Sequence, residues 1–548
     1  MRERVLDAIY KKLDEYPENE NLQRQITLLN MASICTIDSF CLDVVKNNFY
    51  ELENVSPNFR IADTPEIELL KQEILDELFE NKYLSEDKDF TKLINTYTSY
   101  RDDTPLKDLI LSIYSYISSS PYPLKWLNEK IEMFNIKDEL DKDFSQTPWG
   151  KVLLEEMDEE LTDDLAILED TVKGMEYEKE LEIFKQIMES DIKQLSTLKE
   201  NLNNWNKAYE IAQNIKFTAW SRKKVESEIK EEAKNVRDSV KDKFKRKTGK
   251  IFVSDSQQSN QDIFDMYDIL KKLEKLIIEF DEIFSKRKRD KNIVDFTDIE
   301  HFALNILVKD VETTTDENGE KYKKIIKTEV AKKYTEKFEE IAIDEYQDSN
   351  LVQEFILSSI SRGNNMFMVG DVKQSIYRFR QAMPKLFLEK YETYGTVQKC
   401  LVNMSNNVEK QNLTKKDSKS ETNLDCPNCL TGRKIQLFKN FRSRDNVLDF
   451  TNLIFENIMS TKLGEVDYNE DEYLNFGAED YKKIEQNLKT EIDIIDVKTE
   501  EENEEDSQEC SNKYYENSDD FDDEDVENLD ELEHLENIEI EAKYVANK

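Results

Sequence analysis

Residues 338–380 read FEEIAIDEYQDSNLVQEFILSSISRGNNMFMVGDVKQSIYRFR and decide the fold expected for this chain. Two short apolar runs within them, IAI and MFMV, are followed closely by acids: Asp344 and Glu345 after the first, and Asp371 after the second. Buried strands that end in carboxylates place those groups in the crevice beyond an open α/β sheet. Paired acids there suit a hydrated Mg²⁺ and a water activated against a phosphate. The stretch therefore predicts half of a nucleotide-hydrolysis site.

The acids of IAIDEYQD can be given roles from their chemistry. Asp344, the first residue after the strand, would hold Mg²⁺ through its water shell, and Glu345 would orient or deprotonate the attacking water. The alternative is a solvated acidic loop at a strand end, which an isolated Asp-Glu pair would favour. The second motif, GDVKQSIYRFR, makes the combination more specific, because Gln374 within it can hydrogen bond to a γ-phosphate.

The run from Tyr377 to Arg380 alternates aromatic rings with guanidinium groups. Such alternation suits rings that stack on unpaired bases beside arginines that pair with phosphates. The alternative for Tyr377 and Phe379 is core packing. Their spacing of two places both rings on one side of an extended segment, and the neighbouring arginines disfavour a purely apolar environment.

Length and composition indicate a large intracellular protein with long helices. At 548 residues the chain exceeds one ordinary core, so two or more domains are expected. Glycine and proline are scarce, at 10 and 9 residues, which favours helices over structures with many tight turns. Six cysteines do not form a disulfide scaffold, no signal peptide opens the sequence, and no apolar run reaches the roughly 18 residues of a membrane span. A reducing cytoplasm is the expected compartment.

The net charge of −42 is unevenly distributed. Residues 500–541 contain 21 acidic residues and one lysine. This segment could mimic DNA or regulate the protein, but a solvated, disordered linker is the favoured interpretation because like charges repel and bury little. Basic clusters at 222–224, 241–250 and 286–289 either follow DNA phosphates or are exposed helix faces, and the sequence favours neither.

Hydrophobic periodicity and composition divide the chain into six segments. They are residues 1–64, a helical segment (65–290), residues 291–400, a polar insertion (401–434), residues 435–498 and an acidic segment (499–548). Local expectations include a helix over the first 16 residues, strands at 33–37, 434–438 and 490–497, and a polar loop at 313–321. Further helices are expected at 293–307, capped by Thr297 or Asp298, and after Asp445 as its cap.

Three motifs occur in order: DEYQD, GDVKQSIYRFRQA and NFRSRDNVLDFTN. They resemble motifs II, III and IV of UvrD-like superfamily 1 helicases, and TIDSFC at residues 36–41 resembles the motif that follows motif Ia in that family. The segments TIDSFCLDVV, PNFRIAD, VDFTDIEHFAL and VDYNEDEYLNFGA are similar to the AddA family of helicase–nuclease proteins. The resemblance implies an α/β fold of the P-loop NTPase class. Residues 1–64 and 291–400 would form an incomplete RecA-like motor domain, residues 65–290 a large all-α insertion in it, and residues 435–498 the start of a second RecA-like domain.

The resemblance also implies roles for single residues at the nucleotide. Asp344 and Glu345 match the Mg²⁺-binding and catalytic acids. Gln374 matches the glutamine that couples the γ-phosphate to DNA. Arg442 of NFRS matches the arginine that reaches the γ-phosphate from the cleft between the motor domains.

The DNA-contacting positions of the family can be placed in the same way. Phe379 and Arg380 match the aromatic and basic positions that contact single-stranded DNA, with Tyr377 nearby. Thr36 and Asp38 fall where the family touches the DNA backbone, and Asp38 stands where histidine is more usual.

The phosphate-binding loop of the family has no counterpart in the sequence. A G-x-x-x-x-G-K-[ST] segment is needed to surround the β- and γ-phosphates, and none of the ten glycines meets that pattern. Motifs V and VI and the nuclease domain are also missing. We therefore expect a portion of an AddA-like protein that is inactive by itself.

Cys426 and Cys429 form a CPNC pair in the polar insertion. A structural zinc site needs four ligands, and the only histidines, His301 and His534, are far away in the sequence. An incidental or labile redox pair is favoured over half of a zinc site.

The function implied for the complete protein is ATP-driven DNA unwinding with nuclease action in double-strand break repair and homologous recombination. ATP and Mg²⁺ are the implied cofactors, and DNA and an AddB-like protein in a heterodimer are the implied partners, without a membrane. One alternative is a non-catalytic DNA- or partner-binding module that retains relic helicase motifs. Another is an acidic scaffold protein.

Overall fold

The computed structural model is mostly helical, with short strands between the helices. It describes residues 2–29, 32–53, 55–98, 102–315, 321–375, 381–396, 432–470, 472–483, 491, 542 and 545–546. The chain divides into two compact units, Met1–Tyr394 and Gly395–Lys548, and each is described by itself.

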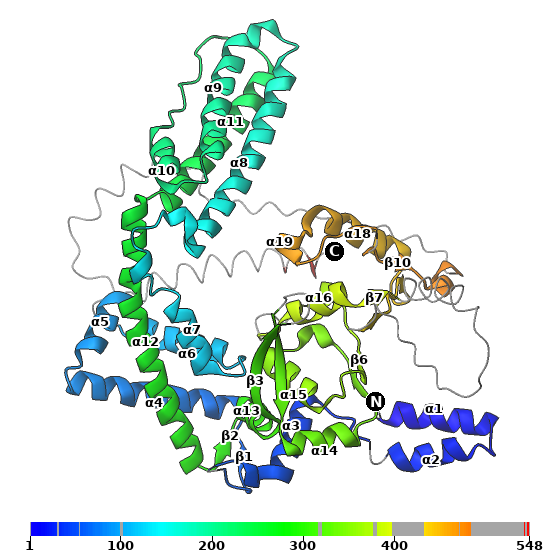
Figure 1. The fold of residues 1–548 in the computed structure, drawn as a ribbon. Coiled ribbons are helices and arrows are strands. Elements are labelled where there is room, and N and C mark those ends of the chain that lie inside the picture. Colours follow the sequence, from blue (N-terminus) through cyan, green and yellow to red (C-terminus); the bar gives the residue numbers. More distant parts are fainter. Residues whose placement is uncertain are drawn as a thin grey trace, which may run out of the picture. The chain divides into compact units, whose positions relative to one another are not determined.

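The first unit begins with two helices, α1 (Arg2–Glu15) and α2 (Glu20–Leu29), that pack against each other (Figure 1). The helix expected at the start of the sequence is thus confirmed. The strand expected at 33–37 is wrong, because that segment is a loop from which α3 (Ile37–Asn48) begins. The hydroxyl of Thr36 accepts a hydrogen bond from the backbone N–H of Ser39, and this cap favours the helix start.

Helices dominate residues 64–290, as the apolar spacing predicted. They are α4 (Thr64–Leu84), α5 (Lys88–Tyr97), α6 (Thr104–Ile117), α7 (Pro123–Glu132), α8 (Pro148–Met175), α9 (Glu182–Glu200), α10 (Trp205–Asn214), α11 (Glu228–Ile251) and α12 (Ser256–Asp290). Figure 1 shows α8, α9 and α11 running alongside one another. No helix among the described residues combines the length and the apolar composition needed to cross a bilayer.

Two hydrophobic clusters hold these helices together. One is formed by α8 to α11 around Phe184 and Trp205, and the other by α4 to α7 with Phe280 and Phe284 of α12. Each fully buried side chain of this kind contributes roughly 1.5–3 kcal/mol. The first residue of α12, Ser256, accepts a hydrogen bond from the backbone N–H of Phe144 at 2.7 Å, so this helix connects both clusters.

A third cluster, built from α3 and residues 294–360, belongs to the α/β part of the unit. Its elements are β1 (Arg60–Ile61), β2 (Ile293–Val294), α13 (Phe296–Leu307), α14 (Glu329–Lys337), β5 (Ile341–Ile343), α15 (Leu351–Ile360) and β6 (Met366–Met368), followed by α16 (Pro384–Thr393). β1 pairs with β2 and β5 with β6, both in parallel. Parallel strands need a crossover, and α15 provides it between β5 and β6.

Two local expectations in this part are corrected. α13 is capped by Asp295, not by Thr297 or Asp298, because Asp295 accepts a hydrogen bond from the N–H of Asp298 while the Asp298 carboxylate accepts one from the N–H of Asp295. Both ends of the polar loop expected at 313–321 are strands instead, because β3 (Val308–Thr315) pairs antiparallel with β4 (Lys321–Lys327), while residues 316–320 lie outside the described residues. The β-branched threonines at the end of β3 suit a strand, although their polarity resembles a loop.

The described residues of the second unit include two parallel strand pairs and two α-helices. β7 (Gly395–Thr396) pairs with β8 (Arg433–Lys434), β9 (Lys439–Asn440) pairs with β10 (Asn475–Phe476), and α18 (Asp445–Ile458) is followed by α19 (Thr461–Gly464). The strand expected at 434–438 is wrong beyond Lys434, since no strand pairs with Ile435 to Phe438 among the described residues and both Ile435 and Phe438 are exposed. Helix α18 is confirmed, but Arg444 occupies its cap position, and Asp445 lies in its first turn.

Several expectations concern residues outside the described part of the chain. These are the polar insertion up to residue 431 with its CPNC pair, the strand at 490–497 apart from residue 491, and nearly all of the acidic segment 499–548.

Candidate functional site

The carboxyl ends of β5 and β6 lie at the same edge of their strand pair. Ile341 faces Met366 and Ile343 faces Met368 across the ladder, so both strands end at the same level. The pairing continues through the N–H of Val369, which donates to the carbonyl of Ile343 at 2.9 Å. The strands predicted from IAI and MFMV are confirmed over Ile341–Ile343 and Met366–Met368, and the acids that follow them lie at one edge. The expected burial is wrong for most of both strands, because only Ile343 is buried and Phe367 is 60% exposed.

Asp344 and Glu345 both expose their side chains directly after β5. Glu345 has a φ of 51°, in the left-handed region that non-glycine residues rarely adopt. Its N–H donates to Oδ1 of Asp344 at 3.2 Å, which fixes the first acid relative to the turn. A left-handed residue costs of order 1–3 kcal/mol and persists only where its surroundings hold it. The turn therefore aims the two carboxylates in a way that a regular loop would not.

Gln347 is the residue that holds this turn. Its side chain is 1% exposed, and its Nε2 donates to Oε2 of Glu345 at 2.8 Å. Its Oε1 accepts a hydrogen bond from the N–H of Asp371 at 3.1 Å. Gly370 leaves room for this contact, because a Cβ on it would lie 2.5 Å from that oxygen. Gln347 thus connects the turn after β5 to the turn after β6.

Gln374 lies in a short 3-10 turn that Asp371 begins. Its Nε2 donates to Oδ2 of Asp371 at 3.0 Å, and its side chain is otherwise exposed. Lys373 pairs with Oδ1 of the same carboxylate at 3.1 Å. Asp344, Glu345 and Gln374 are therefore brought into one hydrogen-bonded neighbourhood through Gln347 and Asp371.

Tyr346 anchors the turn from below. It is fully buried, its hydroxyl donates to Glu354 of α15, and burial followed by the charge of Glu354 raises its pKa. Lys390 of α16 pairs with Glu354 at 2.9 Å and lies 5.0 Å from the centroid of the Tyr346 ring. Burial, and then the charge of Glu345, raises the pKa of Asp348. The acidic turn is therefore held by the buried ring of Tyr346 and by the charged pair of Glu354 and Lys390 from two helices.

Thr36 and Asp38 lie at the start of α3, next to the cluster around Tyr346. Ile37, between them, packs against the cluster that contains Ile343 and Tyr346. The Thr36 hydroxyl serves as a helix cap and is exposed. Burial raises the pKa of the Glu300 carboxyl on α13, and the charge of nearby Asp38 raises that pKa further.

Glu300 links α3 to the segment after the acidic turn. It accepts a hydrogen bond from Nε2 of Gln353 at 2.7 Å, and Gln353 completes the capping box of α15 with Asn350. The start of α3 and the acidic turn are therefore joined by a short series of polar contacts.

The remaining predicted residues lie either outside the described residues or in the second unit. Tyr377, Phe379 and Arg380 lie outside the described residues. Arg442 belongs to the second unit, where its N–H donates to Oδ1 of Asn440 at 2.9 Å and its side chain is exposed. Their roles stay predictions.

The carboxylates suit a hydrated Mg²⁺ better than a metal held by protein ligands alone. Mg²⁺ keeps most of its waters and uses one or two carboxylates together with substrate phosphates. Among the described residues, no group of three or more Asp, Glu, His or Cys side chains is arranged to hold a metal. The exposed carboxylate of Asp344, next to that of Glu345, suits a Mg²⁺ ion that keeps most of its waters. The two side chains are therefore compatible with Mg²⁺ that arrives with a nucleotide.

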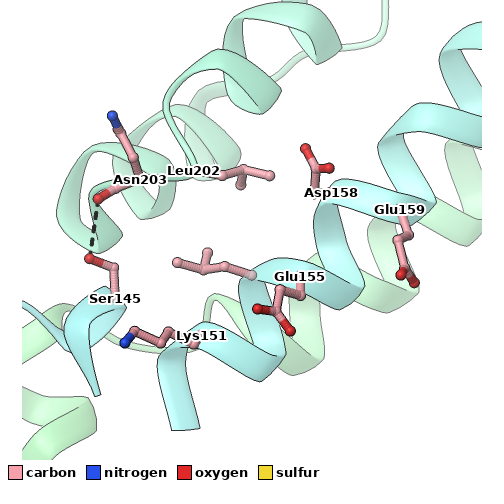
Figure 2. A pocket seen from close by; sticks show the side chains of 8 residues that line it. Ser145, Lys151, Glu155, Asp158, Glu159, Leu202 and Asn203 are labelled. Carbon is pink, nitrogen blue, oxygen red and sulfur yellow. Dashed lines mark hydrogen bonds between the residues drawn. The ribbon is translucent and has the colours of Figure 1, made fainter. Parts of the chain in front are cut away.

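A surface cavity of about 370 Å³ lies elsewhere, between α8 and the loop that precedes α10 (Figure 2). Three acids of α8 line it together with Lys151, and Ser145 donates to the carbonyl of Asn203 at 3.2 Å across one end. None of the predicted site residues lines it. The excess of carboxylates disfavours a phosphate ligand, so the nucleotide is not expected there.

Comparison with known proteins defines the class. The UvrD/REP helicase N-terminal domain model matches residues 1–395, and the chain belongs to this family. It is 41% identical over 490 residues to AddA of Clostridioides difficile (strain 630), a component of an ATP-dependent helicase/nuclease; the match covers 87% of this chain and 35% of that protein.

Two other relatives have the same name. The identity is 38% over 537 residues for Clostridium acetobutylicum, covering 93% of this chain and 40% of the relative, and 40% over 528 residues for Clostridium beijerinckii, covering 93% and 38%. The resemblance to AddA drawn from the motifs is confirmed. The chain spans between 35% and 40% of the length of these three relatives.

Two functional candidates were missed by the sequence reasoning, namely Gln347 and Gly370. Both lie inside the motifs, but their contact joins residues 23 positions apart and has no periodic signal. The available signal was the polarity of Gln347 in a segment that must turn sharply after a short apolar strand.

Proposed function

We propose that this chain forms the hydrolytic half of an ATP-dependent DNA helicase motor. The observation that carries the proposal is the convergence of Asp344, Glu345 and Gln374 at the carboxyl ends of two parallel strands. Ligands of open α/β sheets bind at such strand ends. Membership of the UvrD/REP helicase family and the names of the relatives support DNA as the substrate. In this proposal the strands belong to an incomplete RecA-like domain, with residues 65–290 as its helical insertion.

The proposed roles rest on the chemistry of the side chains and on the family resemblance. Bound Mg²⁺·ATP supplies the phosphate to be cleaved and the positive charge that polarises it. Asp344 would hold the hydrated metal through its water shell, and Glu345 would accept a proton from the attacking water. Gln374, whose amide is exposed and reaches Asp371, senses the γ-phosphate. Arg442, which the family resemblance assigns to the γ-phosphate, would complete the charge stabilisation.

DNA is bound by a second group of residues. Thr36 and Asp38 lie at the start of α3, whose first residue packs against the core beneath the acidic turn, so movement at the nucleotide can reach them. Tyr377, Phe379 and Arg380 follow Gln374 within a few positions, and their rings and guanidinium suit a single strand. The residues proposed for ATP hydrolysis and those proposed to contact single-stranded DNA are therefore adjacent along the chain.

The 548 residues act within a longer protein in this proposal. The relatives are more than twice as long, and their names describe one component of an ATP-dependent helicase/nuclease. Those names support a nuclease activity and a second, AddB-like protein in the complete assembly. Double-strand break repair and homologous recombination in the cytoplasm are the processes in which such an assembly acts. By itself the chain has no phosphate-loop sequence and is expected not to hydrolyse ATP.

A chimaera tests the proposal. The chain is joined to the flanking segments of the Clostridioides difficile relative, and DNA-stimulated ATP hydrolysis and unwinding are measured with Glu345→Gln. Removal of a general base typically lowers turnover about 10²- to 10⁴-fold. The matched control is Glu340→Gln, an exposed acid at the opposite end of the same strand, which should hydrolyse ATP like the parent. Equal turnover in both variants would reject the assignment.

Calorimetric titration of the unmodified chain with Mg²⁺·ATP gives a separate test. We expect weak binding or none, because the backbone N–H groups and lysine of a phosphate loop are missing from the sequence. Micromolar affinity would contradict the idea that the chain holds only the carboxylate half.

The second candidate is a non-catalytic DNA- or partner-binding module with relic motifs, which the missing phosphate loop favours. The DNA upstream of the codon for Met1 discriminates between the two. An in-frame G-x-x-x-x-G-K-[ST] favours the helicase, whereas a promoter and start site favour the binding module.

A further inference from the structure

The side chain of Gln347 is placed between two turns that the proposed reaction uses. It is buried, and both ends of its amide are engaged, one with Glu345 and the other with the backbone of Asp371. A backbone N–H can only donate, so Asp371 requires the amide oxygen of Gln347 on its side. The amide nitrogen must therefore face Glu345, and the orientation of the side chain is determined by its partners.

The contacts continue on the far side of Asp371. Its carboxylate accepts from Nε2 of Gln374 at 3.0 Å and from Lys373, and its own carbonyl accepts from the N–H of Gln374 at 2.9 Å. When the amide of Gln374 turns to another acceptor, such as a phosphate oxygen, the Asp371 carboxylate loses one of its hydrogen bonds. The N–H of the same residue is the one held by Gln347, so a shift of this turn reaches Gln347 directly.

We propose that Gln347 is a positioning residue that couples the sensing amide of Gln374 to the carboxylate of Glu345 through Asp371. The inference rests on the nucleotide site proposed above. A buried amide cannot let one partner move without leaving a polar group unpaired, which makes the two turns shift together. Gly370 supports the coupling because it permits the close approach of the Gln347 oxygen, and the left-handed Glu345 supports it because its conformation needs an external hold.

A purely structural role would end at holding β5 and β6 together. The strand ladder already does this through the N–H of Tyr346, which donates to the carbonyl of Val369 at 2.9 Å, and through the pairing of Ile343 with Met368. The side chain of Gln347 is not part of that ladder. Its two hydrogen bonds go to groups beyond the strand ends, where the proposed chemistry takes place.

Two substitutions at Gln347 distinguish the hydrogen bonds made by the two ends of its amide. Gln347→Met has a similar shape and removes both hydrogen bonds. Gln347→Glu keeps an acceptor for the N–H of Asp371 but replaces the donor that faces Glu345. The matched control is Gln353→Met on α15, since Gln353 also makes two polar contacts, to Glu300 and Asn350, and lies outside the coupled residues.

Hydrogen exchange of the unmodified chain and these variants gives the first readout, and it needs no nucleotide. In Gln347→Met the amide of Asp371 should exchange about fivefold faster, as expected for a lost hydrogen bond of roughly 1 kcal/mol. Gln347→Glu and Gln353→Met should leave that amide protected. Unchanged exchange in Gln347→Met, or equal acceleration in all three variants, would overturn the proposal. If Gln347→Met does not fold, Gly370→Ala, which crowds the same oxygen, should accelerate the same amide instead.

The second readout is a double-mutant cycle in the chimaera. Gln347→Met and Gln374→Ala each lower kcat for ATP, and because they act on one series of contacts, the double variant should be no slower than the slower single variant. Multiplicative losses would show independent roles and overturn the coupling. Failure of the proposed function is distinguishable, since it would appear as normal turnover in Glu345→Gln while the exchange result still holds.

Discussion

The helical cluster of α8 to α11 and the strand-end site use their carboxylates in opposite ways. Asp191 and Arg237 pair at 2.5 Å with side chains that are 0% and 3% exposed, and the guanidinium also donates to the carbonyl of Thr218 at 2.7 Å. Asp344 and Glu345 are exposed, and within the described residues neither forms an ion pair. Charges that a fold neutralises internally serve its stability, whereas charges left open at strand ends are free to meet a ligand.

The largest effect on stability is expected at the buried pair of Asp191 and Arg237. Arg237→Met leaves the Asp191 carboxylate buried without its partner, and breaking such pairs costs about 3–5 kcal/mol. Urea denaturation followed by circular dichroism measures the loss. The double variant Asp191→Leu with Arg237→Met removes both charges and should recover most of the stability. A loss below about 1 kcal/mol in the single variant would mean that the pair is not buried in solution.

A smaller effect is expected at the start of α3. Thr36→Ala removes the hydroxyl that caps the helix and should cost about 1 kcal/mol, while Thr36→Ser keeps the cap. Single-stranded DNA binding, measured by fluorescence anisotropy in the chimaera, should weaken in Thr36→Ala beyond what its stability loss explains. Wild-type affinity in Thr36→Ala would assign this hydroxyl to the helix alone.

The acids of the site should contribute little to stability. Glu345→Gln and Asp344→Asn replace exposed groups, and surface substitutions of this kind usually change stability by less than about 0.5 kcal/mol. The same urea series measures both variants against Arg237→Met. If either variant were destabilised by several kcal/mol, these acids would serve the stability of the fold, and the contrast between the two regions would not hold.

The smallest effect concerns Glu300 and its pH dependence. Burial, assisted by the charge of Asp38, raises its pKa above the unfolded value, while its hydrogen bond from Gln353 opposes the shift. The stability that this group contributes is therefore complete below its unfolded pKa and declines as the pH rises through its folded pKa. Glu300→Gln cannot ionise, so it should gain stability over the parent at about pH 7 and none at about pH 4. An equal difference at both pH values would show that Glu300 does not titrate in this range.

The sequence predicted the elements whose signals are local. The IAI and MFM strands, the helices over residues 64–290 and α18 follow from apolar spacing, and the acids after β5 follow from their position at a strand end. The hairpin of β3 and β4 was missed because its threonines and lysines resemble a polar loop, and its pairing is visible only in three dimensions.

The cap of α13 shows a second kind of limit. Any of three nearby polar residues could cap the helix, and the choice of Asp295 depends on the reciprocal hydrogen bond from Asp298, which fixes where the helix begins. The contacts of Gln347 are a third kind, since they join two turns that separate strands bring together. Spacing in the sequence carries no information on such pairs.

The division of labour between Asp344 and Glu345 is the central claim, and the Mg²⁺ dependence of single-turnover ATP hydrolysis by the chimaera tests it most directly. Asp344→Asn should raise the Mg²⁺ concentration needed for half-maximal hydrolysis. Glu345→Gln should lower the maximal rate about 10²-fold or more while leaving that concentration within about threefold of the parent value. Hydrolysis by both variants at the parental rate and Mg²⁺ requirement would contradict the account.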